Sequence, residues 1–95
     1  MTRTGKYLTV KDWFGNKVAQ ELKRNINMCD VFGILKETEK AYYAVLNVGC
    51  HSSKTMWIPK SVVIENEKSD YHETMRFDSY DEAIEEFRRY WKDFD

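Results

Sequence analysis

The chain has few of the residues that form covalent cross-links or interrupt secondary structure. Its 95 residues include two cysteines, one proline and four glycines. Two cysteines fit a reducing compartment and provide no disulfide framework. No apolar run reaches the roughly 18 residues of a membrane-spanning helix, and the opening stretch MTRTGKYLTV has no apolar signal core. We therefore expect a cytoplasmic protein that crosses no membrane.

The sequence also lacks the common signatures of catalysis. Its glycines, at positions 5, 15, 33 and 49, are scattered and form no phosphate-binding loop. A cysteine nucleophile needs a histidine beside it and a third group that orients the histidine, and the sequence singles out no such set. We therefore predict no enzymatic activity, no catalytic residue and no cofactor.

A zinc site is the alternative raised by the cysteines and histidines. Cys29, Cys50, His51 and His72 are ligand types that zinc accepts in a tetrahedron. Structural zinc sites usually take their ligands in close pairs, whereas Cys29 and His72 stand alone. The neighbours Cys50 and His51 would point to opposite faces of an extended chain. We therefore predict no metal site, a buried Cys29 and a loop position for Cys50.

Aromatic residues are abundant, at 15% of the chain within an apolar share of 42%. Large rings bury much surface each, so one packed core is feasible at this length. Residues 1–95 are predicted to form a single domain.

A helical segment is predicted near the N-terminus. The stretch 9–12 resembles a capping box, with Asp12 in place of the usual glutamate. Gly15 and Asn16 interrupt the pattern and can divide the helix, in which case its second part ends near Arg24. The apolar residues at helical spacing are Val10, Trp13, Phe14, Val18, Leu22 and Ile26.

The middle of the chain predicts strands. Residues 31–37 and 41–48 flank a short polar break, which is typical of a hairpin. The second run is apolar at nearly every position, so we place it inside the sheet and covered on both faces. Residues 55–58 and 61–65 are further strand candidates.

The only proline lies in MWIPKSVV, residues 56–63. Pro59 has no amide hydrogen to donate, so it must lie at a strand end, an edge or a bulge. We interpret the stretch as a kinked passage between two short strands. In this interpretation Trp57 is a core or half-core residue and Lys60 lies outside in solvent.

The strongest helix prediction is at the C-terminus, after a polar loop at 65–71 and a short edge strand within 72–77. Ser79 to Glu82 forms a capping box, S-x-x-E, and Glu85 can pair with Arg89 one turn later. The apolar stripe that follows is Ala83, Ile84, Phe87, Tyr90, Trp91 and Phe94.

Together these segments predict an α+β fold. We expect an antiparallel sheet of three to five strands with the C-terminal amphipathic helix on one face. The N-terminal helical segment would cover the other face.

The pattern ETEKAYYAV at 37–45, followed by a polar loop and MWIPKSVVIE at 56–65, resembles small uncharacterised proteins of phages and other bacterial mobile elements. In those proteins a T-E-K-A hairpin is followed by a tryptophan strand that ends W-I/L-P-K-S. The resemblance includes no catalytic residue. It implies a gene context in which small proteins often bind host machinery, including as inhibitors of defence nucleases (anti-CRISPR proteins among them).

Charge is distributed unevenly along the chain. Residues 1–24 carry six basic and two acidic side chains, whereas residues 65–95 carry five basic and eleven acidic ones. Helix-dipole compensation explains only the acidic residues within the C-terminal helix. We therefore predict protein binding through an acidic surface that faces a basic groove of a host protein, such as a nuclease. The predicted partner-binding residues are Glu65, Glu67, Asp70, Tyr71, Glu73, Asp81, Glu82, Glu85 and Glu86, with Tyr80 and Tyr90 as further anchors.

The alternative is a small module that binds single-stranded nucleic acid. Sheet aromatics can stack bases while lysines hold the phosphates. The net charge of −1 argues against a strong phosphate-binding field. The residues predicted for this alternative are Lys36, Lys40, Tyr43, Lys54, Trp57 and Lys60.

Overall fold

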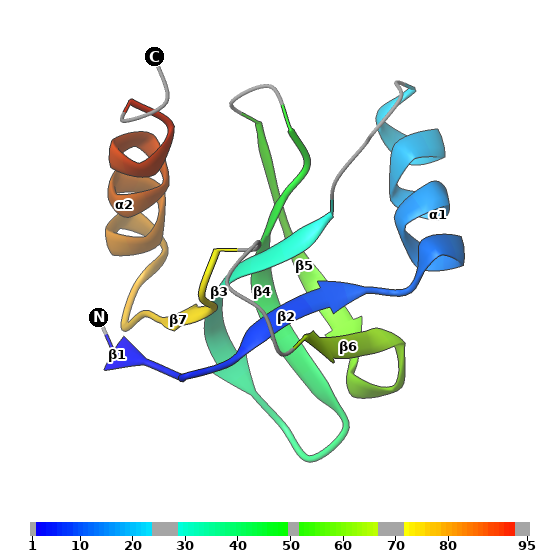
Figure 1. The fold of residues 1–95 in the computed structure, drawn as a ribbon, viewed down its shortest axis with the longest axis horizontal. Coiled ribbons are helices and arrows are strands. Elements are labelled where there is room, and N and C mark those ends of the chain that lie inside the picture. Colours follow the sequence, from blue (N-terminus) through cyan, green and yellow to red (C-terminus); the bar gives the residue numbers. More distant parts are fainter. Residues whose placement is uncertain (1, 24–28, 50–51, 67–71, 93–95) are drawn as a thin grey trace.

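The computed structural model describes residues 2–23, 29–49, 52–66 and 72–92. One sheet lies between two helices, which confirms the predicted α+β class (Figure 1). The elements are β1 (Thr2–Arg3), β2 (Tyr7–Val10), α1 (Asp12–Leu22), β3 (Asp30–Glu37), β4 (Ala41–Asn47), β5 (Ser53–Pro59), the 3-10 turn η1 (Lys60–Val62), β6 (Val63–Asn66), β7 (Met75–Arg76) and α2 (Tyr80–Lys92).

Five of the strands form an antiparallel succession, in the order β6-β2-β3-β4-β5. The turn η1 leads from β5 to β6, and β6 returns to pair with β2 along four residues. Two register shifts interrupt the pairing of β3 with β4, one between Val31 and Gly33 and one between Ile34 and Lys36. Such bulges bend a strand, so the sheet curls and has an inner and an outer face.

Among the described residues the sheet is mixed and has seven strands, which corrects the prediction of an antiparallel sheet of three to five. β7 runs parallel to β3 and antiparallel to β1. The predicted edge strand within 72–77 is therefore an inner one. β1 and β7 are two residues long each, and β2 is four, so none of them leaves a clear periodic signal in the sequence.

The inner face of the sheet encloses the larger hydrophobic cluster. Phe14 and Val18 of α1 pack into it, so α1 covers this face as predicted. The other buried members come from the strands, the loops beside them and η1: Leu8, Val10, Val31, Ile34, Ala44, Leu46, Val48, Ile58 and Val62.

The N-terminal helix differs from its prediction in its capping and in its continuity. Its N-cap is Lys11, which makes no side-chain capping bond, because Thr9 and Val10 belong to β2 and pair with β6. The predicted capping box at 9–12 is therefore wrong. The helix also runs through Gly15 and Asn16 without a break. Burial of one apolar face outweighs the roughly 1 kcal/mol that a helical glycine costs.

The outer face of the sheet packs against α2. The second cluster contains Phe32, Val45, Met75, Phe77, Ala83 and Phe87. The predicted N-cap of this helix is confirmed, since the backbone N–H of Glu82 donates to Ser79 Oγ at 3.2 Å. Phe94 of the predicted stripe lies outside the described residues.

The central position of β4 is also confirmed. It pairs with β3 on one side and with β5 on the other. Ala44 and Leu46 face the inner cluster while Val45 faces the outer one, and all three are fully buried. The nearly continuous apolar run therefore reflects a strand covered on both faces in its second half.

Two buried details hold the segment around β7 in place. The ring of Phe77 lies directly on Gly33, where an added Cβ would clash with ring carbon Cε2. The hydroxyl of Thr74 donates to the Val31 carbonyl at 2.8 Å and accepts from the Leu8 N–H at 3.1 Å. One threonine thus links three segments of the chain. None of the helices in the described ranges is long and apolar enough to cross a membrane.

Candidate functional site

Three side chains predicted for a binding role lie in one row across β3, β4 and β5. Lys36 is opposite Tyr43 in the β3–β4 ladder, and Tyr43 is opposite Trp57 in the β4–β5 ladder. The rings of Tyr43 and Trp57 have centroids 5.2 Å apart. Trp57 is 47% exposed, Lys36 is exposed and Tyr43 is half-buried. We call these three residues the Trp57 surface.

The exposure of Trp57 corrects the prediction of a core or half-core residue. Its neighbours Met56 and Ile58 both pack on the inner cluster. Because side chains alternate along a strand, Trp57 points to the outer face. Pro59 closes β5, so the predicted strand-end position of the proline is confirmed.

The Trp57 surface lies at the margin of the sheet. Within the described ranges, β5 pairs with β4 only. In the view of Figure 1, α2 stands at the left edge of the molecule and β5 lies farther to the right. The contacts of α2 with the sheet are chiefly with β3. The aromatic pair therefore lies on the same outer face as α2 without being covered by it.

Two of the lysines predicted for nucleic-acid binding, Lys54 and Lys60, form ion pairs away from the Trp57 surface. Lys54 Nζ lies 2.7 Å from Glu21 Oε2 on α1. Lys60 Nζ lies 2.6 Å from Glu37 Oε2 and 4.9 Å from the centroid of the Tyr42 ring. Lys60 is thus part-buried and ion-paired instead of extending into solvent.

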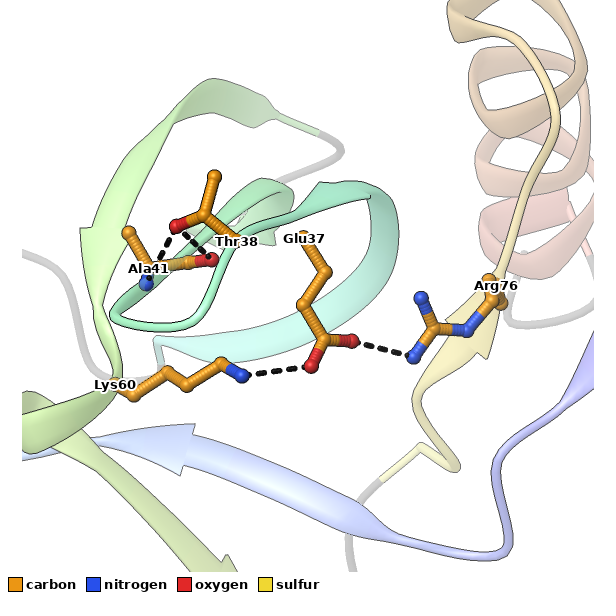
Figure 2. A network of polar contacts seen from close by, with 5 residues as sticks. All are labelled: Glu37, Thr38, Ala41, Lys60 and Arg76. Carbon is orange, nitrogen blue, oxygen red and sulfur yellow. Dashed lines mark hydrogen bonds and ion pairs between the residues drawn. The ribbon is translucent and has the colours of Figure 1, made fainter.

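Glu37 is the centre of the polar network in Figure 2, with one carboxylate oxygen toward Lys60 and the other toward Arg76. The Arg76 Nη2 atom lies 2.8 Å from Glu37 Oε1. Hydrogen bonds from Lys60 and then from Arg76 lower the pKa of the Glu37 carboxyl. Lys40 lies in the turn between β3 and β4 and is exposed.

The described part of the predicted acidic surface is divided between distant places. Glu65 lies in β6, opposite Leu8 of β2, and β6 and α2 are at opposite sides of the molecule (Figure 1). Glu73 is half-buried, with its Oε2 atom 4.0 Å from Arg3 Nε. Glu67, Asp70 and Tyr71 lie outside the described residues. Their role in binding stays a prediction.

The acidic residues of α2 remain together on one helix. Asp81 and Glu85 are exposed, whereas Glu82 and Glu86 are half-buried. Arg89 Nη2 lies 3.6 Å from Glu85 Oε1, which confirms the predicted pair, and Arg89 Nη1 lies 3.0 Å from Glu86 Oε2. The helix therefore presents acidic charge that one arginine partly offsets.

The two tyrosines predicted as anchors on this helix differ in availability. Tyr80 is 51% exposed. Tyr90 instead packs inward, with ring centroids 5.7 Å from Phe32 and 4.6 Å from His72. Burial raises the pKa of the Tyr90 hydroxyl. Of these two tyrosines, Tyr80 has the solvent exposure that a binding anchor requires, and Tyr90 does not.

The described cysteine and histidine occupy separate apolar surroundings. Cys29 is half-buried, and burial raises the pKa of its thiol to about 11, so it is not an activated nucleophile. His72 stacks on Phe32 at a centroid distance of 4.4 Å, and burial lowers its pKa. Cys50 and His51 lie outside the described residues, so the absence of a zinc site stays a prediction.

A buried polar pair was missed by sequence reasoning. Asp30 and Asn47 lie opposite each other in the β3–β4 ladder and are 1% and 0% exposed. Asp30 Oδ1 and Asn47 Nδ2 have no hydrogen-bond partner among the described residues. Burial raises the pKa of the Asp30 carboxyl to about 6. The only sequence signal is an aspartate immediately before the apolar run VFGIL.

No family model, no curated protein and no solved structure was found to match this chain. The function is therefore inferred from the residues and their arrangement.

Proposed function

We propose that this protein is a non-enzymatic binding module that docks a partner protein through the Trp57 surface. Exposed tryptophan and tyrosine side chains dominate the binding energy of many protein interfaces. Trp57 is 47% exposed and contacts the Tyr43 ring. This exposed pair is the observation that carries the proposal.

The acidic residues of α2 would add negative charge on the same outer face of the sheet. Asp81 and Glu85 are exposed on the helix that packs against the outer face of the sheet, the face to which Trp57 also points. A partner with an apolar recess and a basic rim would complement both features. Charge complementarity of this kind raises the association rate and the specificity.

A protein partner is favoured over single-stranded nucleic acid by the positions of the lysines. Nucleic-acid binding needs cations that can hold phosphates beside the stacked bases. Lys54 and Lys60 are committed to Glu21 and Glu37, which leaves Lys36 beside the aromatic pair. The acids exposed on α2, which packs on the same outer face of the sheet, would add repulsion toward phosphates.

The resemblance of residues 37–65 to proteins of phages and mobile elements supports a host protein as the partner. In that context the protein would act in the host cytoplasm. Binding to a basic groove would block the groove, so a defence nuclease or another nucleic-acid-binding protein is the class of target that fits the acidic border. Nucleic-acid binding through the same aromatic row is the second candidate.

A charge reversal separates the two candidates. Asp81→Lys with Glu85→Lys changes two exposed residues, so the fold should persist. If the partner is a basic protein groove, captured from the host and identified, the double variant should associate more slowly. If the partner is nucleic acid, the variant should bind single-stranded DNA more tightly, because repulsion from the phosphates is removed.

The two expected changes have opposite signs, so the double variant, measured with each partner, separates the two candidates. The wild-type protein should show no affinity for single-stranded DNA in the micromolar range at physiological salt. Micromolar DNA binding that strengthens after the reversal would replace the protein-binding proposal with the nucleic-acid one. Circular dichroism of the variant serves as the control for folding.

A further inference from the structure

A second concave site lies away from the Trp57 surface. A pocket with a volume of about 260 Å³ opens beside the inner hydrophobic cluster. Its apolar part is formed by Leu8 and Ile34, which belong to that cluster, with Tyr42 packed beside them. The full set of lining residues is Arg3, Thr4, Lys6, Leu8, Ile34, Glu37, Tyr42 and Arg76.

One side of the pocket is fixed by hydrogen bonds between distant parts of the chain. Thr4 Oγ1 donates to the Thr74 carbonyl at 2.5 Å and accepts from the Lys6 N–H at 3.1 Å. The Thr74 N–H donates to the Lys6 carbonyl at 2.8 Å. Gly5 makes the turn between them with φ of 71°. The connection that carries Arg3 and Lys6 is therefore tied to the body of the protein.

Cations outnumber acids in the lining of the pocket. Arg3, Lys6 and Arg76 line it together with one carboxylate, Glu37. Arg3 Nε also lies 4.0 Å from Glu73 Oε2, outside the lining. The Glu37 carboxylate is already shared between Arg76 and Lys60, as Figure 2 shows. Lys6 forms no ion pair with any acid in the ranges that the structure describes.

Arg76 gains an ion pair with Glu37, but like charges around a concavity still repel one another. An anion in the pocket would relieve the repulsion. Arginine presents paired donors that match the oxygens of a phosphate, and lysine adds a point charge. The apolar side of the pocket can hold an organic group.

We propose that the pocket binds a small phosphate monoester whose organic part lies against Leu8, Ile34 and Tyr42. The volume corresponds to roughly nine water molecules of the liquid, at about 30 Å³ each. A phosphate group with a small organic part fits this space, and a nucleoside monophosphate would fill it and extend beyond it. The proposal is independent of the Trp57 surface, because no residue is common to the two sites.

The test is a titration with a nucleoside 5′-monophosphate followed by two-dimensional NMR of the labelled protein. We expect saturable shifts at the backbone amides of Thr4, Lys6 and Leu8. Inorganic phosphate should shift the same amides with lower affinity, since it lacks the organic part. The unphosphorylated nucleoside should bind far more weakly than the monophosphate.

Two lining variants give opposite expected changes. Arg76→Gln should lower the affinity for the monophosphate about tenfold, since one charge-assisted contact is lost. Glu37→Gln should raise the affinity for the monophosphate severalfold, because this substitution removes the negative charge among the lining residues. Arg88→Gln is the matched control on α2, exposed and outside the pocket, and should leave the affinity unchanged.

Lys6 is exposed, so Lys6→Gln is a second variant that should remain folded. It should also lower the affinity for the monophosphate. Shifts that do not saturate, or that occur around Arg88 as strongly as around Lys6, would overturn the proposal. Weaker binding by Glu37→Gln in a protein that remains folded would overturn it as well. A monophosphate affinity no higher than that of inorganic phosphate would contradict the assigned position of the organic part.

Discussion

Replacing Asp30 by asparagine should stabilise the protein at neutral pH. The carboxyl is 1% exposed and its pKa is raised by burial from 3.8 to about 6. A carboxylate with a raised pKa is destabilised in the folded state relative to the unfolded one. Asparagine keeps the shape of the side chain and removes the charge.

The magnitude follows from the size of the pKa change. Each pKa unit corresponds to about 1.36 kcal/mol, so a rise from 3.8 to about 6 amounts to roughly 3 kcal/mol. This penalty is complete above pH 6, where Asp30 is ionised in both states. It is absent below pH 3.8, where the carboxyl is protonated in both. Between these values the folded state binds the extra proton, so the contribution of Asp30 to stability falls as pH rises.

The assay is urea denaturation of the wild-type protein and of Asp30→Asn at pH 7 and at pH 4. The variant should be more stable by up to about 3 kcal/mol at pH 7, and the difference should shrink toward zero at pH 4. Asp78→Asn, at an exposed position, is the control and should change the unfolding free energy by less than about 0.5 kcal/mol. A variant less stable than wild type at pH 7 would refute the reasoning, since the carboxylate would then be favourably paired.

Three other substitutions test the packing of the fold by chemical denaturation. Gly33→Ala should cost about 1–3 kcal/mol, because its Cβ must displace the buried Phe77 ring; a neutral effect would mean that the ring can move freely. Thr74→Val should cost about 1–3 kcal/mol, since two buried backbone groups lose their partner, and an unchanged midpoint would contradict that role. Ser79→Ala should cost about 1 kcal/mol through loss of the cap on the Glu82 N–H, whereas Ser79→Asp should retain most of the stability.

The features that the sequence predicted well are those encoded locally. Helix α2 follows from a capping residue, Ser79, and from an apolar stripe that includes Ala83 and Phe87. The β3–β4 hairpin follows from two apolar runs around a short polar turn. Each signal lies within about a dozen residues, where periodicity and turn chemistry act.

The features that could not be predicted depend on contacts between distant residues. The parallel pairing of β7 with β3 joins segments about 40 residues apart, and two-residue strands carry no pattern of their own. The partners of Lys54 and Lys60 lie 33 and 23 residues away in sequence. No local rule distinguishes these two lysines from a solvated one.

Two of the missed features did have a local signal. Trp57 stands between Met56 and Ile58, and strict alternation in a strand places it opposite to both. The size and apolar character of the ring led instead to a core assignment. Gly33 lies inside a strand, which often marks a close approach of another group, and here that group is Phe77.

The most direct test of the proposed function compares two exposed tryptophans in binding to the captured host protein. Trp57 is 47% exposed on β5, and Trp13 is 59% exposed on α1, which covers the other face of the sheet. We expect Trp57→Ala to remain folded and to lower the affinity by about 2 kcal/mol, or roughly 30-fold, while Trp13→Ala binds as the wild type does. Equal affinities for the wild type and a folded Trp57→Ala variant would contradict the proposal.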